Sequence, residues 1–385
     1  GYTIGGVPSV FHQPGYILAL AAGYAVAGAG WTGVLATNAV VGVAQVLLTV
    51  RVAARLDPRA AVPAGVVAAA HPVLVWHGLA VADTTLFSVT LLGWLDATLA
   101  AARDGGRRNT ILAGLWLGAA VLTRPSILPL VPLGALAVLV GRSDWRAALR
   151  FVAGSAAVAF VLALPWLVRN HALTGEFPLV GTHGAESMWA ANSPGAPEAT
   201  WQDSTYDEVS WSKAGTEFDV YAFQSRLDPA ESVRREAVFQ EAATRWIREN
   251  TGTFAAMTVV RFGRIWDLRY HPTRRGAREL PGRLARTLVH ASSHAPVLAF
   301  ALVGVVVLWR RRERRVEVAL LVGVLLLYTA SHAAGAGYTR VRLPVDPLLV
   351  ALAGAGAAAL WSRFRASRAA SGELGGDRPV SPRSS

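Results

Sequence analysis

The sequence predicts an all-α polytopic membrane protein with about nine transmembrane helices and a large mixed extracytoplasmic loop. Of its 385 residues, 53% are hydrophobic and only 16% are charged, whereas a soluble domain would carry about 25% charged residues. The mean hydropathy is +0.37. The apolar residues fall in long runs, and basic residues recur after every second run. Together these observations indicate a chain that crosses a bilayer repeatedly.

Nine apolar segments are long enough, or nearly long enough, to cross about 30 Å of hydrocarbon. They cover residues 32–50, 60–79, 84–102, 109–123, 125–141, 148–168, 292–309, 316–333 and 343–361. The fourth and fifth segments are short, and they form either two spans or one re-entrant hairpin. In both cases the chain returns to the side it came from, so the predicted topology is the same.

Arginine clusters after alternate segments orient the chain. The clusters are Arg51, Arg55 and Arg59; Arg103, Arg107 and Arg108; Arg142, Arg146 and Arg150; the run RRRERR from Arg310 to Arg315; and Arg363, Arg365 and Arg368. Because cytoplasmic loops are enriched in basic residues, we expect all five clusters in the cytoplasm. The net charge of +12 could indicate nucleic-acid binding, but these arginines lie between hydrophobic segments rather than on one folded face. We therefore predict no nucleic-acid partner.

This topology divides the chain into five regions. Residues 1–30 are part of a first extracytoplasmic loop with an interfacial helix, 31–168 a transmembrane bundle, 169–291 an extracytoplasmic loop domain, 292–361 the C-terminal transmembrane helices, and 362–385 a disordered cytoplasmic tail. Residues 1–30 are thus expected outside, with no anchor before them. Either the chain inserts with its N-terminus outside, or a first span precedes Gly1; we favour the second.

The loop domain contains two recognisable helices. In the first, Asp228 is the expected N-cap, Pro229 occupies the first helical position, and Glu231 completes a capping box. The following segment, TFAAMTVVRFGRIWDLRY, reads as an interfacial helix that leads back to the membrane. The chain has no cysteine, which excludes disulfides and cysteine-based metal sites.

Several charged residues are predicted at the outer ends of the spans. They are Asp83, Arg124, Arg169, Arg340, Arg342 and Asp346. Charges near a span are costly and often functional. Arginine forks bind phosphate oxygens, and a carboxylate can take a proton from a hydroxyl or hold a metal or a sugar hydroxyl. This set therefore suggests a lipid phosphate bound at the outer surface.

Each residue also has a purely structural interpretation. Asp83 could cap the third span, and Arg124, Arg340 and Arg342 could extend to lipid headgroups. Histidines in such positions, here His71 and His77, are more often hydrogen-bonded within the helix bundle than ligands of a metal or a substrate. The joint pattern is thus more informative than any single member.

Five stretches, in order, resemble GT-C glycosyltransferases of the protein O-mannosyltransferase type (glycosyltransferase family 39 and its bacterial relatives). They are HQPGYILALAAGYAVAG, AAAHPVLVWHGLAVADTTLFSVTLLGW, WLGAAVLTRPSILPLVP, ALPWLVRNHALTGEFPLVGTHGAESMWAANSP and AGYTRVRLPVDPLLVALAG. The resemblance covers nearly the whole chain. It is specific for the superfamily and not for the sugar.

The resemblance implies an inverting transfer from a polyprenyl-phosphate sugar on the outer side of the membrane, either with or without a divalent metal. Asp83 matches the second of two acidic residues, and the principal base is expected upstream of Gly1, since residues 1–10 contain no Asp or Glu. The expected donor-phosphate residues are Arg340, Arg342, Arg124 and Tyr338. The expected substrate-binding residues are His183, Trp189 and Asn192.

Partners and compartment follow from this resemblance and the composition. We expect a polyprenyl-phosphate sugar donor, membrane lipids, and an acceptor that is a glycan, a lipid or a protein. Lys213 is the only lysine in a chain rich in Ala, Gly and Val, which suggests a GC-rich bacterial genome and hence the bacterial plasma membrane. The rival functions are a carrier or flippase for a lipid-linked anion, and a non-catalytic membrane scaffold.

Overall fold

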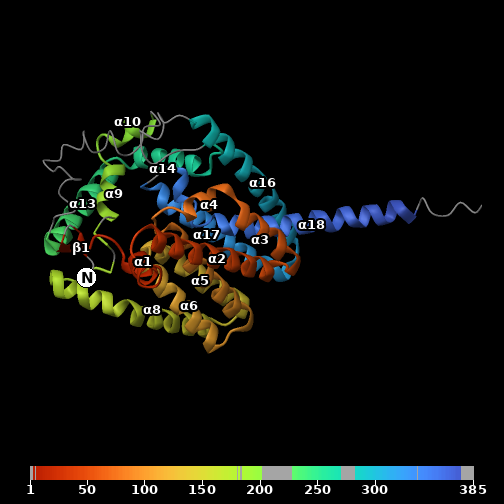
Figure 1. Ribbon diagram of the computed structural model, residues 1–385, viewed down its shortest axis with the longest axis horizontal. Coiled ribbons are helices and arrows are strands. Elements are labelled where there is room, and N and C mark those ends of the chain that lie inside the picture. The colour runs from red at the N-terminus through yellow and green to blue at the C-terminus, as the bar shows by residue number, and fades with distance from the viewer. Residues whose placement is uncertain are drawn as a thin grey trace, which may run out of the picture.

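A computed structural model describes residues 3, 4, 6–179, 181, 182, 184–201, 228–269, 282–335 and 337–373. Figure 1 shows a bundle of helices with a second group of helices at one end. This second group consists of α9 (Gly184–Ala191), α10 (Ala196–Trp201), α13 (Pro229–Glu249) and α14 (Thr251–Trp266). The strands described are β1 (Thr3–Ile4) and β2 (Val7–Pro8), which form one antiparallel hairpin.

Seven helices within the described ranges are long and apolar enough to cross a membrane. They are α2 (Trp31–Leu56), α5 (Thr84–Asp104), η2 (Pro125–Leu130) joined to α7 (Val131–Arg142), α8 (Trp145–Thr174), α16 (Arg283–Arg310), η3 (Arg312–Arg314) joined to α17 (Arg315–Ala333), and α18 (Asp346–Glu373). An eighth span results if Pro58–Ala70 and Pro72–Gly78, which meet at an angle of 58°, count as one. The predicted all-α multi-pass fold is confirmed.

The number of spans is lower than the nine expected. The segment 109–123 forms α6 (Arg107–Val121), which has 15 residues. At 1.5 Å per residue this helix is about 22 Å long, which is shorter than the hydrocarbon thickness. The other expected segments correspond to the spans found, including the bent pair of η1 (Pro58–Ala60) with α3 (Ala61–Ala70) and α4 (Pro72–Gly78).

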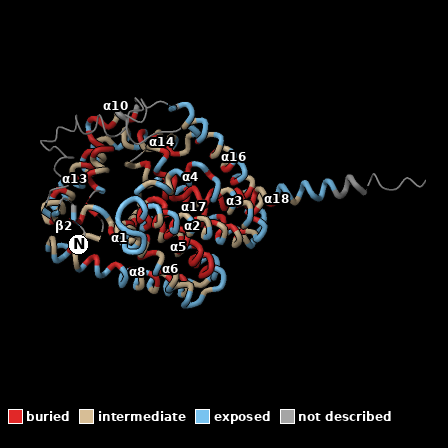
Figure 2. The backbone as a smooth tube through the Cα atoms, viewed as in Figure 1, coloured by how far each residue is buried: buried red, intermediate tan, exposed pale blue. Residues whose placement is uncertain are grey.

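Helix α5 lies at the centre of the bundle. Within its span 94% of residues are buried, against 28–61% in the other six. Figure 2 shows buried residues concentrated around α5 and its neighbours. Because α5 has almost no lipid-facing surface, it can carry the buried polar residues Ser88, Thr90, Asp96 and Thr98 at positions that would be costly in hydrocarbon.

Glycines allow α16 and α18 to pack with their backbones in contact. A Cβ added to Gly304 would lie 2.0 Å from the Leu352 carbonyl oxygen, and one added to Gly356 would lie 2.0 Å from that of Phe300. Such close approach is typical of small residues at helix interfaces in membranes. Helix α18 then continues past the expected end of its span and projects from the bundle, so residues 362–373 are helical rather than part of a disordered tail (Figure 1).

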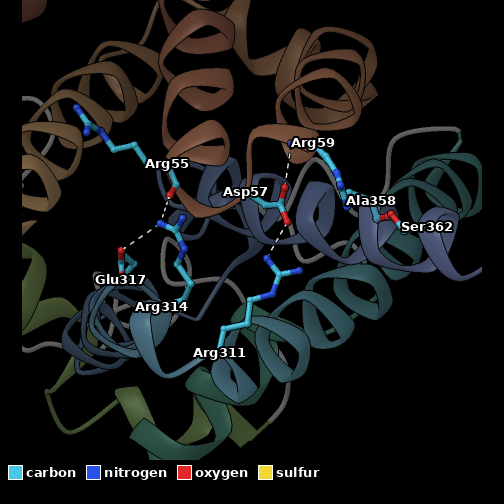
Figure 3. A network of polar contacts seen from close by, with 8 residues as sticks. All are labelled: Arg55, Asp57, Arg59, Arg311, Arg314, Glu317, Ala358 and Ser362. Carbon is cyan, nitrogen blue, oxygen red and sulfur yellow. Dashed lines mark hydrogen bonds and ion pairs between the residues drawn. The ribbon is translucent and has the colours of Figure 1, made fainter.

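The arginine-rich ends of several helices are tied together by ion pairs. Figure 3 shows Arg311 directed at Asp57, with Nη1 and Oδ2 3.0 Å apart, and Arg314 donating to the Arg55 carbonyl oxygen at 2.7 Å. Asp96 of α5 accepts from Arg55 and, at 2.7 Å, from Arg51. The first and fourth arginine clusters therefore lie at the same end of the bundle.

Two predictions about helices outside the spans have clear outcomes. Within residues 1–30, where a helix was predicted, the structure has α1 (Pro14–Ala27). Asp228 caps α13, and its Oδ1 accepts from Ala230 N at 2.9 Å and Glu231 N at 3.3 Å. The capping box is incomplete, because the Glu231 carboxylate binds Arg234 Nη2 at 2.7 Å.

Candidate functional site

Asp83 and Arg124 form an ion pair at one end of α5. Arg124 Nε donates to Asp83 Oδ2 at 2.9 Å, and its Nη2 donates to Asp83 Oδ1. The same Nη2 donates to Thr84 Oγ1 at 3.1 Å. The Asp83 side chain is 34% exposed and that of Arg124 is 23% exposed. A carboxylate held by a bidentate arginine is thus accessible from outside the bundle.

The prediction that Asp83 caps α5 is wrong. Its side chain makes no cap hydrogen bond, and its backbone is already helical, with φ −71° and ψ −8°. An N-cap residue normally adopts extended backbone so that its side chain can turn back to the first free N–H groups. Here both carboxylate oxygens instead accept charge-assisted hydrogen bonds from Arg124, which are stronger than a neutral cap.

Local sequence places Arg124 opposite Asp83. Arg124 precedes Pro125, and a residue before proline favours extended backbone. Its φ of −149° and ψ of 114° fit this expectation. The Thr-Arg-Pro turn therefore ends α6 and begins η2 at the level where α5 begins.

The Pro-Gly-Tyr stretch of α1 packs against this turn. Gly15 N donates to the Leu122 carbonyl oxygen at 2.7 Å. A Cβ on Gly15 would lie 2.6 Å from Thr123 Oγ1, so this approach requires glycine. Tyr16 Oη then donates to Asn38 Oδ1 at 2.9 Å, and Asn38 Nδ2 donates to the Ala80 carbonyl oxygen at 3.1 Å.

Tyr16 stays protonated at physiological pH. Burial raises its pKa above the ordinary value of 10.0, although the hydrogen bond to Asn38 opposes this shift. Asp83 also interacts electrostatically with Tyr16 and contributes to the rise. Tyr16 is thus a neutral donor that links α1, α2 and the segment before α5.

Helix α17 contributes Tyr328 next to this group. The Tyr328 ring is fully buried and stacks on Phe87 with centroids 5.9 Å apart. Its side chain interacts electrostatically with Arg124. His332, one turn later, lies with Nδ1 2.8 Å from the Tyr328 carbonyl oxygen. Arg124 therefore interacts both with the partly exposed Asp83 and with the buried Tyr328.

The two arginines of the loop between α17 and α18 are in different environments. Arg340, on η4 (Thr339–Val341), is exposed, and its side chain makes no hydrogen bond or ion pair within the described residues. Arg342 is fully buried, and it donates to Asp346 Oδ1 at 2.7 Å and to the Ile265 carbonyl oxygen at 2.8 Å. Tyr338 packs against a small cluster that includes Ile265. Only Arg340 is therefore presented to a ligand outside.

Three buried histidines surround the Arg342–Asp346 pair. His71, His290 and His294 all interact electrostatically with both members of the pair. The rings of His290 and His294 stack with centroids 5.5 Å apart. Nevertheless, no three or more His, Cys, Asp or Glu side chains in the described part of the chain are placed to hold a metal ion. This group connects α16, α18 and the junction of α3 with α4.

Two of the predicted substrate-binding residues, Trp189 and Asn192, lie in α9 or directly after it. Asn192 is fully buried; its Nδ2 donates to the Ala334 carbonyl oxygen at 2.9 Å, and its Oδ1 accepts from Arg261 Nη1 at 3.2 Å. Trp189 packs against a cluster formed by Ala196, Trp246 and Met257. His183 lies outside the described residues. Asn192 thus joins α9 to the end of α17.

The sequence prediction did not assign a role to Tyr16, Asn38 or Tyr328. A signal for Asn38 was present, because Asn38, Gln45 and Thr49 recur at helical spacing along α2 and are all buried. A polar stripe on a membrane helix points into the bundle rather than to lipid. Tyr328 gives no comparable pattern, since its importance depends on which helix packs beside it.

Residues 11–168 match the family model of dolichyl-phosphate-mannose-protein mannosyltransferases. A search of curated proteins found no match. Among solved structures, the chain is similar to ArnT from Cupriavidus metallidurans bound to undecaprenyl phosphate, with 15% identity and a TM-score of 0.43 over 91% of this chain and 68% of that one. The match agrees with the predicted resemblance to protein O-mannosyltransferases within residues 11–168, a part of the chain that includes Tyr16, Asp83 and Arg124.

Proposed function

We propose that this multi-pass membrane protein, a GT-C type glycosyltransferase, transfers a sugar from a polyprenyl-phosphate donor to an acceptor hydroxyl with inversion. The observation that carries the proposal is the convergence of Tyr16, Asp83 and Arg124 from three separate motifs, all within the matched residues. The family description names a dolichyl-phosphate-linked mannose, which supports a polyprenyl-phosphate donor.

In this proposal Asp83 takes the proton of the acceptor hydroxyl. Each oxygen of an ionised carboxylate can accept more than one hydrogen bond, so the pair with Arg124 leaves acceptor capacity on both. The acceptor oxygen bonds to the anomeric carbon as the bond from that carbon to the phosphate oxygen breaks. The electron pair leaves with the phosphate, and the proton ends on the carboxylate. Arg124 orients Asp83 beforehand through its contacts with both carboxylate oxygens.

Arg340 is proposed to bind the phosphate that leaves. It is exposed and interacts electrostatically with His77, which lies shortly before Asp83 on α4. A guanidinium there would stabilise the charge that grows on the phosphate as the glycosidic bond breaks. Arg342 was predicted to share this role, but its partners are Asp346 and Ile265. We assign it to positioning the loop that carries Arg340.

We infer that the reaction takes place outside the cytoplasm of a bacterial cell. Asp83 and Arg124 lie at the start of α5, whereas Arg103 follows at its other end. Since basic clusters mark the cytoplasmic side, the ion pair faces outward. The acceptor would then be a hydroxyl of an envelope glycan, a lipid or an exported protein.

The test is a transfer assay in proteoliposomes that contain a radiolabelled polyprenyl-phosphate sugar. We expect sugar transfer with release of polyprenyl phosphate. Asp83→Asn should lower the rate by at least about 100-fold, because general-base catalysis contributes roughly 10²–10⁴. Asp104→Asn, at the other end of the same helix, is the matched control and should retain the rate. Donor that crosses the bilayer uncleaved would instead establish the flippase alternative and contradict this proposal.

A further inference from the structure

A second polar site lies at the end of α5 remote from Asp83. There α5, α6, α7 and α8 enclose a cavity of about 640 Å³. It is lined by Ala101, Gly105, Gly106, Arg107, Thr110, Ile111, Val138, Arg142, Ala147, Arg150, Phe151, Gly154 and Val158. None of these residues belongs to the proposed active site, so the cavity calls for an explanation of its own.

One wall of the cavity is strongly basic. It is lined by Arg107, Arg142 and Arg150 and by no acidic residue. Arg107 is exposed, and its side chain makes no hydrogen bond or ion pair in the part of the chain that the structure describes. Arg142 Nη1 donates one bond, 3.3 Å long, to the Arg103 carbonyl oxygen. Arg150 Nε donates to the Arg146 carbonyl oxygen at 3.2 Å, and its Nη2 lies 3.5 Å from Asp144 Oδ2. Most of the donor capacity of these guanidinium groups is therefore available to an anion.

The start of α6 adds backbone donors to the same wall. Gly106 is the N-cap of α6, and no side chain caps the helix there. Gly105 and Gly106 both have positive φ, 68° and 92°, and both line the cavity. A Cβ on Gly105 would lie 3.5 Å from Arg142 Cζ, so the bare glycine backbone and the guanidinium are neighbours. An uncapped helix N-terminus favours a phosphate.

The rest of the cavity is largely apolar and reaches the surface of the bundle at Ile111. Ile111, Val138, Phe151 and Val158 line it, and Ile111 is 38% exposed. Figure 1 shows α5, α6 and α8 together in this part of the bundle. A ligand that fits both walls carries an anionic group at one end and hydrocarbon at the other. A soluble phosphate would use only the basic wall.

We propose that this cavity binds the phosphate headgroup of an anionic phospholipid whose acyl chains lie along α6 and α8. Basic pockets between transmembrane helices on the cytoplasmic side are known to accept such headgroups. Bidentate arginines and the α6 N-terminus would hold the phosphate, and the apolar wall would hold the first methylenes. The site is separate from the sugar-transfer chemistry and would anchor the cytoplasmic end of the bundle.

The experiment measures lipid binding to the purified full-length protein in detergent, by native mass spectrometry with phosphatidylglycerol and with phosphatidylcholine. We expect phosphatidylglycerol to bind preferentially. The triple variant Arg107→Gln, Arg142→Gln, Arg150→Gln should weaken that binding by at least about tenfold, since each arginine contributes to headgroup attraction. Ala147→Trp, which fills the cavity without changing charge, should weaken it comparably.

Four outcomes would overturn the proposal. The first is equal binding of the two lipids. The second is the same loss in the triple variant Arg363→Gln, Arg365→Gln, Arg368→Gln, which removes three charges from α18 and would indicate diffuse attraction to a basic surface. The third is full displacement of phosphatidylglycerol by millimolar inorganic phosphate, which would make free phosphate the ligand. If Ala147→Trp binds normally, the cavity is not the site.

Discussion

The pairing of Asp83 with Arg124 changes how each residue is understood. From sequence, Asp83 was a helix cap as well as a catalytic candidate, and Arg124 was equally consistent with a headgroup contact. In the structure the carboxylate makes no hydrogen bond to the α5 N-terminus, and Arg124 binds both of its oxygens. The two residues should therefore behave as one unit.

This unit predicts non-additive effects on the rate of transfer. Arg124→Gln should lower kcat by about 100-fold, as Asp83→Asn does, because each change leaves the other side chain misoriented. The double variant should be about as slow as either single one, since contacting residues that act together do not add. Initial rates for the four proteins at saturating donor measure this. Multiplicative losses would show that the two residues act independently.

The hydrogen bond between Tyr16 and Asn38 leads to a prediction about the stability of the protein. Tyr16→Phe removes the hydrogen bond to Asn38 and should lower the free energy of unfolding by about 1 kcal/mol. Thermal unfolding in detergent measures the loss. Tyr24→Phe is the matched control, since Tyr24 lies on the same helix and is 37% exposed.

The pH dependence of this contribution follows from the raised pKa of Tyr16. Because the folded protein holds the phenolic proton more tightly than the unfolded chain, the stabilisation is complete below pH 10. It is lost as the pH rises through the folded pKa. The difference between wild type and Tyr16→Phe should therefore be constant from pH 6 to 9. A difference that declined within that interval would show that Tyr16 ionises there.

At the scale of elements, the burial of α5 explains its composition. Its hydropathy is 1.4, below the 2.2 of α8, yet it is the most buried span. Other helices rather than lipid surround it, so its polar side chains can bond within the bundle. Ser88 Oγ, for example, donates to the Pro344 carbonyl oxygen at 2.9 Å. That bond ties the start of α5 to the loop that carries Arg340.

The contact between α16 and α18 depends on glycine. Gly304→Ala should destabilise the protein by about 1–3 kcal/mol, because the new methyl group meets the Leu352 backbone and the helices must separate. Gly323→Ala is the control, since a Cβ there would lie at an ordinary 3.4 Å from Leu133. The shift in unfolding temperature measures both. Equal shifts would mean that helix propensity rather than packing sets the effect.

At the scale of the whole molecule, charge separates the two ends of the bundle. Ion pairs join the arginine-rich turns after α2 and α16 at one end, as Asp57 with Arg311 shows. The Asp83–Arg124 pair lies at the other. Long-range pairs of this kind also explain how a chain with net charge +12 packs its basic turns together.

The predicted orientation can be tested with single cysteines, because the chain has none of its own. Glu176→Cys, after α8, should react with a membrane-impermeant maleimide in intact cells. Arg108→Cys, at the start of α6, should react only after the membrane is permeabilised. Both residues are exposed, so accessibility within the fold is matched. The opposite labelling pattern would place Asp83 in the cytoplasm and contradict the proposed side of the reaction.

The sequence by itself determined the fold class, most of the spans and the motifs that carry the resemblance. Hydrophobic length and the spacing of arginines are local properties, because each span must satisfy its own backbone in lipid. The cap on α13 was also predictable because it is a local feature. Asp228 accepts hydrogen bonds from the backbone N–H groups two and three residues later.

Only the tertiary structure decided what the polar residues do. Asp83 and Arg124 are 41 positions apart, and the choice between a cap and an ion pair depended on where α6 ends. Arg340 and Arg342 are two positions apart, yet one is exposed and the other fully buried. Electrostatic and hydrogen-bond partners are set by helix packing, and packing brings together residues that no local pattern relates.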